Sequence, residues 1–369
     1  MGSAVRLPFT ARSRAALLSA VVLALGVGAC TPAEQSGVGG PLAGAGSSAQ
    51  EVAMTAWVAG MNDSHPDLLL SYDPVGSGTG REMFLEGATH FAGSDASLNE
   101  SEVERARQRC SGAEPIELPL YISPIAVAYN LPEVEEEVQL TPQALAAVFA
   151  GEITAWDHPE IAESNPGLDL PDLAIIPVNR SDDSGTTQNF TEYLAAAGGE
   201  AWPYEPSQTW PRGGTQSAQG SSALVQTIQA ADGTIGYVDA ALVSDELETA
   251  AVLVGEGFVS YDAAAAAAVV DASPPAEGAS DLRLTLDLAR DTDEAGVYPI
   301  VLVSYLIACS AYESEREVAN VRTLLEYVAS PEAQDRAARL DVAGSAPITE
   351  NLREQVLEVV AQIHVVEGD

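Results

Sequence analysis

Short strand-like runs alternate with longer helix-like runs along most of this chain, and this alternation is the feature that most limits its fold. Runs rich in β-branched and other apolar residues lie at 68–72, 122–129, 174–178, 235–238 and 300–307. Apolar residues at helical spacing lie at 49–60, 142–150, 187–197, 222–231, 318–329 and 331–339, and the alanine run at 263–268 is typical of plain helix. Such alternation predicts an α/β protein.

The length and the charge of the chain narrow this class further. The 369 residues exceed what one simple core requires and suit two lobes of ordinary domain size, and 46% hydrophobic residues are enough to build them. The formal net charge is −38, and all 16 basic residues are arginine. Such a surface repels nucleic acid and anionic lipid headgroups. Because the chain has no lysine, it cannot form the lysine-dependent P-loop of an NTPase.

The N-terminal segment has the pattern of an export signal. Three arginines precede an apolar run at 15–28, which is too short to be a good membrane-spanning helix, and small residues then lead to Cys30. This pattern predicts a bacterial lipoprotein signal peptide over 1–29, with cleavage leaving Cys30 as a diacylated N-terminus. The alternative is an ordinary secretory signal with an incidental cysteine. Residues 30–41 are rich in Gly, Pro and Ser and are predicted to form a flexible tether.

Two further cysteines, Cys110 and Cys309, lie in the part of the chain that would be exported. An even pair of cysteines in an oxidising compartment favours a disulfide. Two buried free thiols are the alternative.

Three turns rich in glycine and hydroxyl residues each lead into a predicted helix. They lie at 44–49, 76–80 and 180–187. Each offers unpaired backbone N–H groups at the positive end of a helix together with hydroxyl donors, which is what an oxyanion requires. Helix capping alone would explain any one of these turns. The third turn also begins with Arg180, whose planar guanidinium can hold two anion oxygens, although a surface ion pair with Asp182 or Asp183 is the alternative.

Asp95 is the residue that narrows the choice of anion most. By composition it is a loop or capping aspartate. In an anion site, however, a carboxylate is stable only if the ligand carries a proton to donate to it, because two sets of lone pairs otherwise oppose each other. Phosphate at neutral pH carries such a proton and sulfate does not. Asp95 therefore favours phosphate over sulfate.

The motifs along the chain resemble those of the phosphate-binding protein of the phosphate-specific ABC transporter, the PstS family, in its actinobacterial lipoprotein form. Residues 140–194 carry most of the resemblance, with "AVFAGEITAWDHPEI" followed by "NPGLDLPDLAIIPVNRSDDSGTTQNFTEYL". The segments "GAGSSAQ", "GSGTG", "FAGSDASL" and "GTIGYV" extend it over nearly the whole mature chain. The resemblance implies the following phosphate-binding residues: Ser48, Ala49 through its backbone, Ser77, Asp95 as acceptor of the phosphate proton, Arg180 as the charged group, Ser184, Gly185 and Thr186. Many members have Thr-Phe where this chain has Ser48-Ala49, so the large ring that covers the ligand is missing here.

The resemblance also implies the architecture and the role of the chain. It predicts two α/β lobes of the periplasmic-binding-protein type (type II) that close by a hinge, with the ligand in the cleft between them. Lobe I would comprise 42–123 plus 299–369 and lobe II 124–298, so Cys110 and Cys309 would share lobe I. The implied function is capture of inorganic phosphate on the extracellular face of the cytoplasmic membrane. The protein would act as a lipid-anchored monomer and deliver phosphate to the permease subunits of an ABC importer.

Two other functions remain open at this point. One is a receptor for another oxyanion, such as sulfate or molybdate. The other is a secreted phosphoester hydrolase with Ser77 or Ser184 as nucleophile, although the sequence shows no general base or metal site for one. The four histidines lack metal-ligand spacing and no Gly-x-Ser-x-Gly motif is present, so we expect neither a metal, a cofactor nor catalysis.

Overall fold

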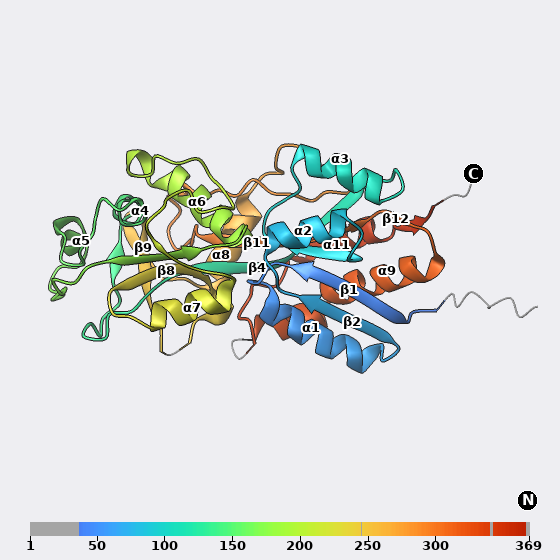
Figure 1. Cartoon of the computed structure of the whole chain (residues 1–369), viewed down its shortest axis with the longest axis horizontal. Helices are drawn as coiled ribbons and strands as arrows, with labels where there is room; N and C mark the ends of the chain where they lie inside the picture. Colours follow the sequence, from blue (N-terminus) through green and yellow to red (C-terminus); the bar gives the residue numbers. More distant parts are fainter. Residues whose placement is uncertain (1–36, 245, 340–341, 367–369) are drawn as a thin grey trace, which may run out of the picture. The chain divides into compact units, whose positions relative to one another are not determined.

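The computed structural model describes residues 37–244, 246–339 and 342–366 (Figure 1). The predicted signal peptide, Cys30 and most of the predicted tether lie outside the described residues. Within the described residues, no helix is both long enough and apolar enough to cross a membrane.

Helices and strands alternate as the sequence predicts. The N-terminal part contains β1 (Gly40–Gly46), α1 (Glu51–Ser64), β2 (Leu68–Asp73), α2 (Ser77–Leu85), β3 (Phe91–Ser94), α3 (Glu100–Arg109) and β4 (Pro115–Tyr129). The middle part contains β5 (Gln139–Leu140), α4 (Pro142–Ala150), α5 (Pro159–Ser164), β6 (Ile176–Arg180), α6 (Gly185–Ala197), β7 (Gln216–Ala218), α7 (Ser221–Gln229), β8 (Thr234–Asp239), β9 (Glu248–Val254), β10 (Gly257–Val259) and α8 (Ala263–Ala272). The C-terminal part contains β11 (Val301–Cys309), β12 (Ala311–Tyr312), α9 (Glu315–Ala329), α10 (Pro331–Ala338), α11 (Glu350–Val360) and β13 (His364–Val365).

One long strand, β4, joins two groups of elements. The main sheet runs in the order β2-β1-β3-β11-β4-β8-β6-β7, and β12 and β13 form a small separate pair. Residues 115–124 of β4 pair with β11, whereas residues 125–129 pair with β8. We call the group with β1–β3, α1–α3 and α9–α11 lobe I, and the group with β5–β10 and α4–α8 lobe II; Figure 1 shows them to the right and left of β4. This arrangement agrees with the predicted two-lobe binding-protein fold.

The two lobes repeat the same local arrangement. In lobe I, β1 runs parallel to β2 and β3, and in lobe II, β6 runs parallel to β7 and β8. Parallel strands place their carboxyl ends, and the helices that follow them, at the same edge of a sheet, where α/β proteins bind ligands.

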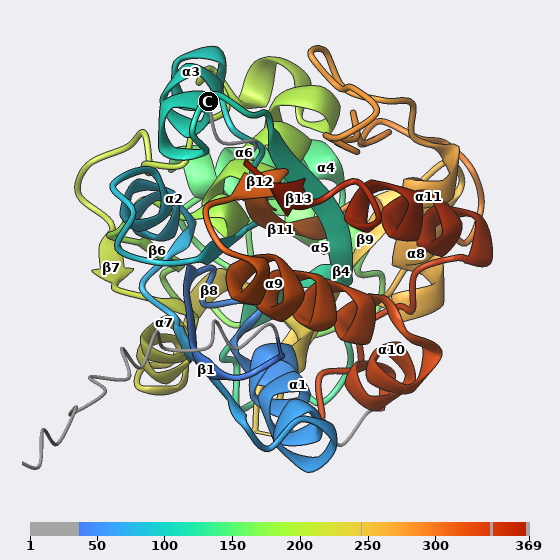
Figure 2. The ribbon, with the colours of Figure 1, turned by 90° about the vertical axis from the view of Figure 1, so that its right-hand side faces the viewer.

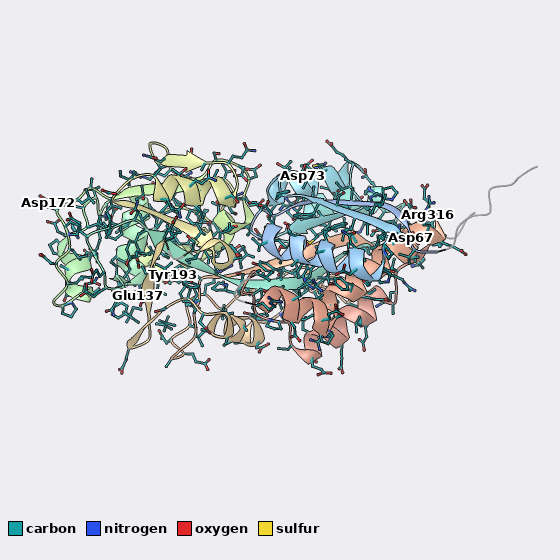
Figure 3. The ribbon with its side chains drawn as sticks, turned by 90° about the horizontal axis from the view of Figure 1, so that it is seen from below. Asp67, Asp73, Glu137, Asp172, Tyr193 and Arg316 are labelled. Atoms are coloured by element: carbon teal, nitrogen blue, oxygen red, sulfur yellow. A yellow bond between two sulfur atoms is a disulfide. The ribbon has the colours of Figure 1, made fainter. Side chains whose placement is uncertain are left out.

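Figure 2 looks onto lobe I, with α1, α9 and α10 lying in front of the sheet. Figure 3 places Asp67, Asp73 and Arg316 in lobe I and Glu137, Asp172 and Tyr193 in lobe II.

The packing explains why β4 and β11 are apolar along most of their length. All 15 residues of β4 and all nine of β11 are buried, because both faces of the central sheet are covered. The helices that flank the sheet begin where the sequence supplies caps. Thr141 accepts a hydrogen bond from the N–H of Ala144 ahead of α4, and Ser314 caps α9 in the same way. These caps fix where the helices start relative to the strands.

The structure corrects the sequence prediction at the N-terminal side of lobe I. The predicted tether, 30–41, extends into β1, because β1 begins at Gly40 and pairs with β2 from that residue onward. The segment GPLAGAG resembles a linker in composition, but its small residues are required by packing. A Cβ on Gly44 would lie 2.1 Å from the ring of Phe91. The exact lobe boundaries at 123/124 and 298/299 stay a prediction.

The predicted disulfide is confirmed. Cys110 follows α3 and Cys309 ends β11, and the two form a bond with their Cα atoms 5.4 Å apart and a sequence separation of 199 residues. Both cysteines are in lobe I and both are buried.

Replacing both cysteines should lower stability, because the bond restricts the unfolded chain over a long loop. We expect Cys110→Ser/Cys309→Ser to lose about 2 to 5 kcal/mol of unfolding free energy. Urea unfolding measures this loss, and wild-type protein unfolded with a reductant present is the matched control. Equal stability of the oxidised and double-serine proteins would contradict the prediction.

Candidate anion-binding site

The residues that the sequence predicts for an anion site come together where the two lobes meet. Lobe I contributes the segment between β1 and α1, the start of α2 and the end of β3. Lobe II contributes the end of β6 and the start of α6. The candidate side chains are all buried, with at most 4% of each residue exposed: Ser48, Ala49, Ser77, Asp95, Arg180, Ser184 and Thr186.

Asp95 lies at the centre of this cluster and contacts both lobes. Its Oδ2 accepts a hydrogen bond from the Ser77 hydroxyl of lobe I at 3.2 Å and another from the Thr186 hydroxyl of lobe II at 3.4 Å. Gly185 packs against Asp95 and Ser77, since a Cβ on it would lie 2.6 Å from the Cβ of Asp95 and 2.7 Å from the Ser77 hydroxyl. Glycine at this position therefore lets the N-terminus of α6 approach Asp95 closely.

The second oxygen of Asp95 is the strongest sign of a ligand. Oδ1 is buried and has no hydrogen-bond partner among the described residues. Burial raises the pKa of Asp95, and the nearby hydroxyls of Ser47, Ser304 and Ser77 and the charge of Arg180 offset part of the rise. A buried carboxyl group with a raised pKa and an unpaired oxygen is suited to accept a hydrogen bond from a ligand that carries a proton.

Arg180 ends β6 and is held in place by Asp182. Its Nε donates to Asp182 Oδ1 at 2.8 Å, and its Nη2 forms a second, shorter contact with Asp182 Oδ2. Burial acts to raise the pKa of Asp182, but the hydrogen bond and the charge of Arg180 outweigh it and leave this pKa below its usual range. The ion pair that the sequence allowed is therefore present but buried. It leaves Nη1 of Arg180 directed to a serine of α7.

That serine, Ser221, is a site residue that the sequence analysis missed. Its hydroxyl accepts from Nη1 of Arg180 at 3.1 Å and lies 3.0 Å from the hydroxyl of Ser48. Its backbone N–H also donates to Ser48 Oγ at 3.2 Å. Ser221 is the first residue of α7 and follows Gly220. Gly220 and Ser221 therefore form a fourth glycine-serine turn before a helix, and this sequence pattern could have identified Ser221. Ser221 links Ser48 of lobe I to Arg180 of lobe II.

The other predicted donors have partners within their own turns. Ser184 caps α6, its hydroxyl accepting from the N–H of Thr187 at 3.2 Å. The N–H of Ala49 donates to Ser47 Oγ at 3.2 Å. Ser184 therefore lies at the start of α6, as expected, and Ala49 lies two residues ahead of α1, whose N-cap is Gln50.

The charges of the cluster determine what it can bind. Arg180 is paired with Asp182, and Asp95 adds a second carboxyl group, so hydroxyl and N–H groups supply most of the donors. Such a site suits a small oxyanion that still carries a proton, and it opposes an anion that has none. No cluster of His, Cys, Asp and Glu that could hold a metal ion occurs in 37–244, 246–339 or 342–366.

Asp239, the last residue of β8, is a further buried carboxyl group near the site. Its Oδ1 accepts from the Tyr121 hydroxyl and from the N–H of Ala241, both at 2.9 Å. Its Oδ2 has no partner in the described part of the chain. Burial raises the pKa of Asp239 to about 7, against the hydrogen bonds of Ala241, Tyr121 and Ser123, and the charge of Asp95 adds to the rise. Asp239 is therefore partly protonated near neutral pH.

Comparison with known proteins agrees with this fold and site. Residues 31–332 match the family model described as a PBP superfamily domain. The chain is 35% identical over 379 residues to phosphate-binding protein PstS2 of Mycobacterium bovis, covering 96% of this chain and 99% of that protein. It is 34% identical over 292 residues to PstS3 of the same species, covering 77% of each.

Solved structures support the same fold at lower identity. The chain superposes on a high-affinity periplasmic phosphate-binding protein (PfluDING) bound with phosphate, with a TM-score of 0.69 and 23% identity. The match covers 86% of this chain and 93% of the other. The fold and the site thus define a solute-binding protein of the PBP superfamily. On the family match and the 35% identity over nearly the full length, the chain belongs to the PstS family of phosphate-binding proteins.

Asp239 should make stability depend on pH in a direction that can be tested. An unfolded aspartate has a pKa of about 3.9, and the folded pKa of Asp239 is about 7, so the folded state binds the extra proton between these values. Stability therefore falls as pH rises through this window. Asparagine does not titrate and retains an oxygen for the hydrogen bonds of Tyr121 and Ala241.

We expect wild type to lose unfolding free energy relative to Asp239→Asn between about pH 4 and pH 7, and the two curves to run parallel above about pH 8. Urea unfolding across a pH series measures the difference, and acids that do not interact with Asp239 cancel in the comparison. Curves that stay parallel over the whole range would show that Asp239 does not hold a proton in the fold.

Proposed function

We propose that this protein captures inorganic phosphate outside the cytoplasmic membrane and delivers it to an ABC phosphate importer. The observation that carries the proposal is Asp95, a buried carboxyl group with one unpaired oxygen, surrounded by donors from two lobes. Phosphate has oxygens for those donors and a P–OH proton for the carboxylate. Membership in the PstS family supports the same ligand.

The proposal includes the residues and the location. Ser48, Ser77, Thr186 and Arg180 would contact phosphate through their side chains. Ser184 and Gly185 would contribute at the start of α6, and Ala49 would contribute through its backbone ahead of α1. Cys30 would carry the lipid that anchors the protein to the extracellular face of the membrane, and the permease subunits of the importer would be its partners. The protein would act as a monomer and would not catalyse a reaction.

Ligand screening tests the function directly. A ligand that binds only the folded state raises the melting temperature, and at equal ligand concentration the shift grows with affinity. Phosphate should therefore produce the largest shift in a panel with sulfate, molybdate and arsenate. Release of p-nitrophenol from p-nitrophenyl phosphate would instead support the hydrolase alternative. A larger shift with sulfate or molybdate would favour a receptor for that anion.

Arg180→Ala should weaken phosphate binding strongly. The change removes a positive charge from the site and leaves the partly buried Asp182 with only the N–H of Gly220 as a described partner. Charge-assisted bidentate contacts are worth a few kcal/mol. We expect the phosphate Kd to rise about a hundredfold or more. Arg180→Lys should recover only part of the loss, because lysine lacks the planar fork. Calorimetric titration measures both Kd values, and near-wild-type affinity in the alanine variant would remove Arg180 from the site.

Asp95→Asn should change selectivity more than fold stability. Asparagine removes the charge that opposes a fully ionised anion and adds an N–H donor, so sulfate should bind better relative to phosphate. The phosphate-to-sulfate preference should fall by several kcal/mol. Titration of both anions at fixed pH and salt decides this. A wild type that binds both anions equally, or a ratio left unchanged by the substitution, would identify Asp95 as a loop cap only.

A further inference from the structure

Asn189 joins the two lobes directly behind the candidate site. It lies in α6 one turn after Gly185 and is 4% exposed. Its Nδ2 donates to the backbone carbonyl of Asp95 at 2.7 Å and to the carbonyl of Gly185 at 2.9 Å. A single amide group therefore holds the backbone of Asp95 in lobe I and the first turn of α6 in lobe II.

The orientation of the Asn189 amide is fixed by Arg290. Nη2 of Arg290 donates to Asn189 Oδ1, and Nη1 donates to the carbonyl of Val301 in β11 at 3.0 Å. Glu192 accepts from Nε and Nη2 of the same guanidinium at 3.1 and 2.8 Å. An arginine can only donate hydrogen bonds, so Asn189 must present its oxygen to Arg290 and its NH₂ group to the two carbonyls.

Besides the contacts of Thr186 with Asp95 and of Ser221 with Ser48 within the candidate site, two further hydrogen bonds among the described residues cross between the lobes, and the Asn189 contact differs from both. Gly78 N–H donates to the carbonyl of Asp183 at 3.1 Å, and Arg81 donates to Gln208 Oε1 at 2.9 Å. Both of these involve α2 and loop residues of lobe II. Asn189 instead connects the residue whose carboxylate is the candidate phosphate partner to the helix that presents Gly185 and Thr186. Breaking this contact would loosen both sides of the site together.

We propose that Asn189, oriented by Arg290, is a positioning residue that latches the closed lobes around the ligand and thereby slows its release. This inference rests on the proposed function of phosphate capture. The latch forms only when lobe II reaches Asp95. Its loss should therefore speed dissociation of phosphate and leave the association rate, which is set before the lobes meet, nearly unchanged.

The test measures phosphate association and dissociation rates by stopped-flow fluorescence on wild type and two variants. Asn189→Ala removes the hydrogen bonds, and we expect the dissociation rate to rise about three- to tenfold. Asn189→Asp keeps an acceptor for Arg290 but places an oxygen against the carbonyls of Asp95 and Gly185. The repulsion should raise the dissociation rate more than tenfold. Association rates should change less than about twofold.

Two further variants separate a latch from a general structural role. Gln188→Ala is the matched control, because Gln188 is the neighbouring residue of α6 and its side chain donates to Oε1 of Glu192, whereas Arg290 donates to Oε2 of Glu192. The Gln188 side chain has no described hydrogen bond to Asp95, Gly185 or Arg290. It should leave both rates at wild-type values. Arg290→Gln should raise the dissociation rate in the same direction as Asn189→Ala, and the double variant should be no faster than the faster single one, since both act through one contact.

The measured rates either support or overturn the role of Asn189 as a latch. Dissociation rates of the Asn189 variants equal to wild type, in protein that still binds phosphate, would overturn the latch. Equal changes in both rates together with a lower melting temperature without phosphate would also overturn it, since they indicate general destabilisation of α6. A wild type that does not bind phosphate would overturn the proposed function itself and would be detected before any variant is compared.

Discussion

The hydrogen-bonded ladder that β4 forms with β11 and β8 is the constraint on which the rest of the molecule depends. One half of β4 pairs with lobe I through β11, and the other half pairs with lobe II through β8. Because β4 is buried along its whole length, neither half can separate from its partner strand without exposing backbone groups and apolar side chains. The strands of each lobe therefore stay joined to one half of β4, and the main sheet is continuous from lobe I to lobe II. The carboxyl ends of β1, β3 and β6 consequently face one another across the same region.

Buried charge then gives this region its chemical character. Arg180 is the cation closest to the candidate ligand residues, but Asp182 neutralises much of its charge. Asp95 and Asp239 add two more buried carboxyl groups, and burial raises the pKa of both. The site thus attracts an anion through many oriented hydroxyl and N–H dipoles and not through net positive charge. A protein with a net charge of −38 can hold a small anion in this way only if water is excluded and each donor is already in place.

Local sequence signals predicted features that depend on neighbouring residues, such as where a helix begins and ends. The bounds of α4 were predicted to the residue, because Thr141 and Pro142 mark its start and Gly151 its end. Asp95 and Arg180 were selected because their residue types fit an oxyanion carrying a proton, and the structure places both in the buried cluster between the lobes. The strand β1 was missed, because GPLAGAG has the composition of a linker and becomes a strand only between β2 and β3. Ser221 had a local signal, the glycine-serine turn before α7, but its contacts with Arg180 and Ser48 join residues 41 and 173 positions apart, and the contact of Asn189 with Arg290 spans 101. No local pattern reports such pairings.

The disulfide has a topological consequence. Cys110 and Cys309 enclose a stretch that contains the whole of lobe II as defined by its elements, so that lobe is a closed covalent loop inserted in lobe I. A protease that cuts any one peptide bond between these two cysteines leaves both fragments joined through sulfur. The loops of lobe II, such as the segment between α6 and β7, can therefore be nicked without releasing a fragment, and the sheet can hold the cut chain in its native arrangement.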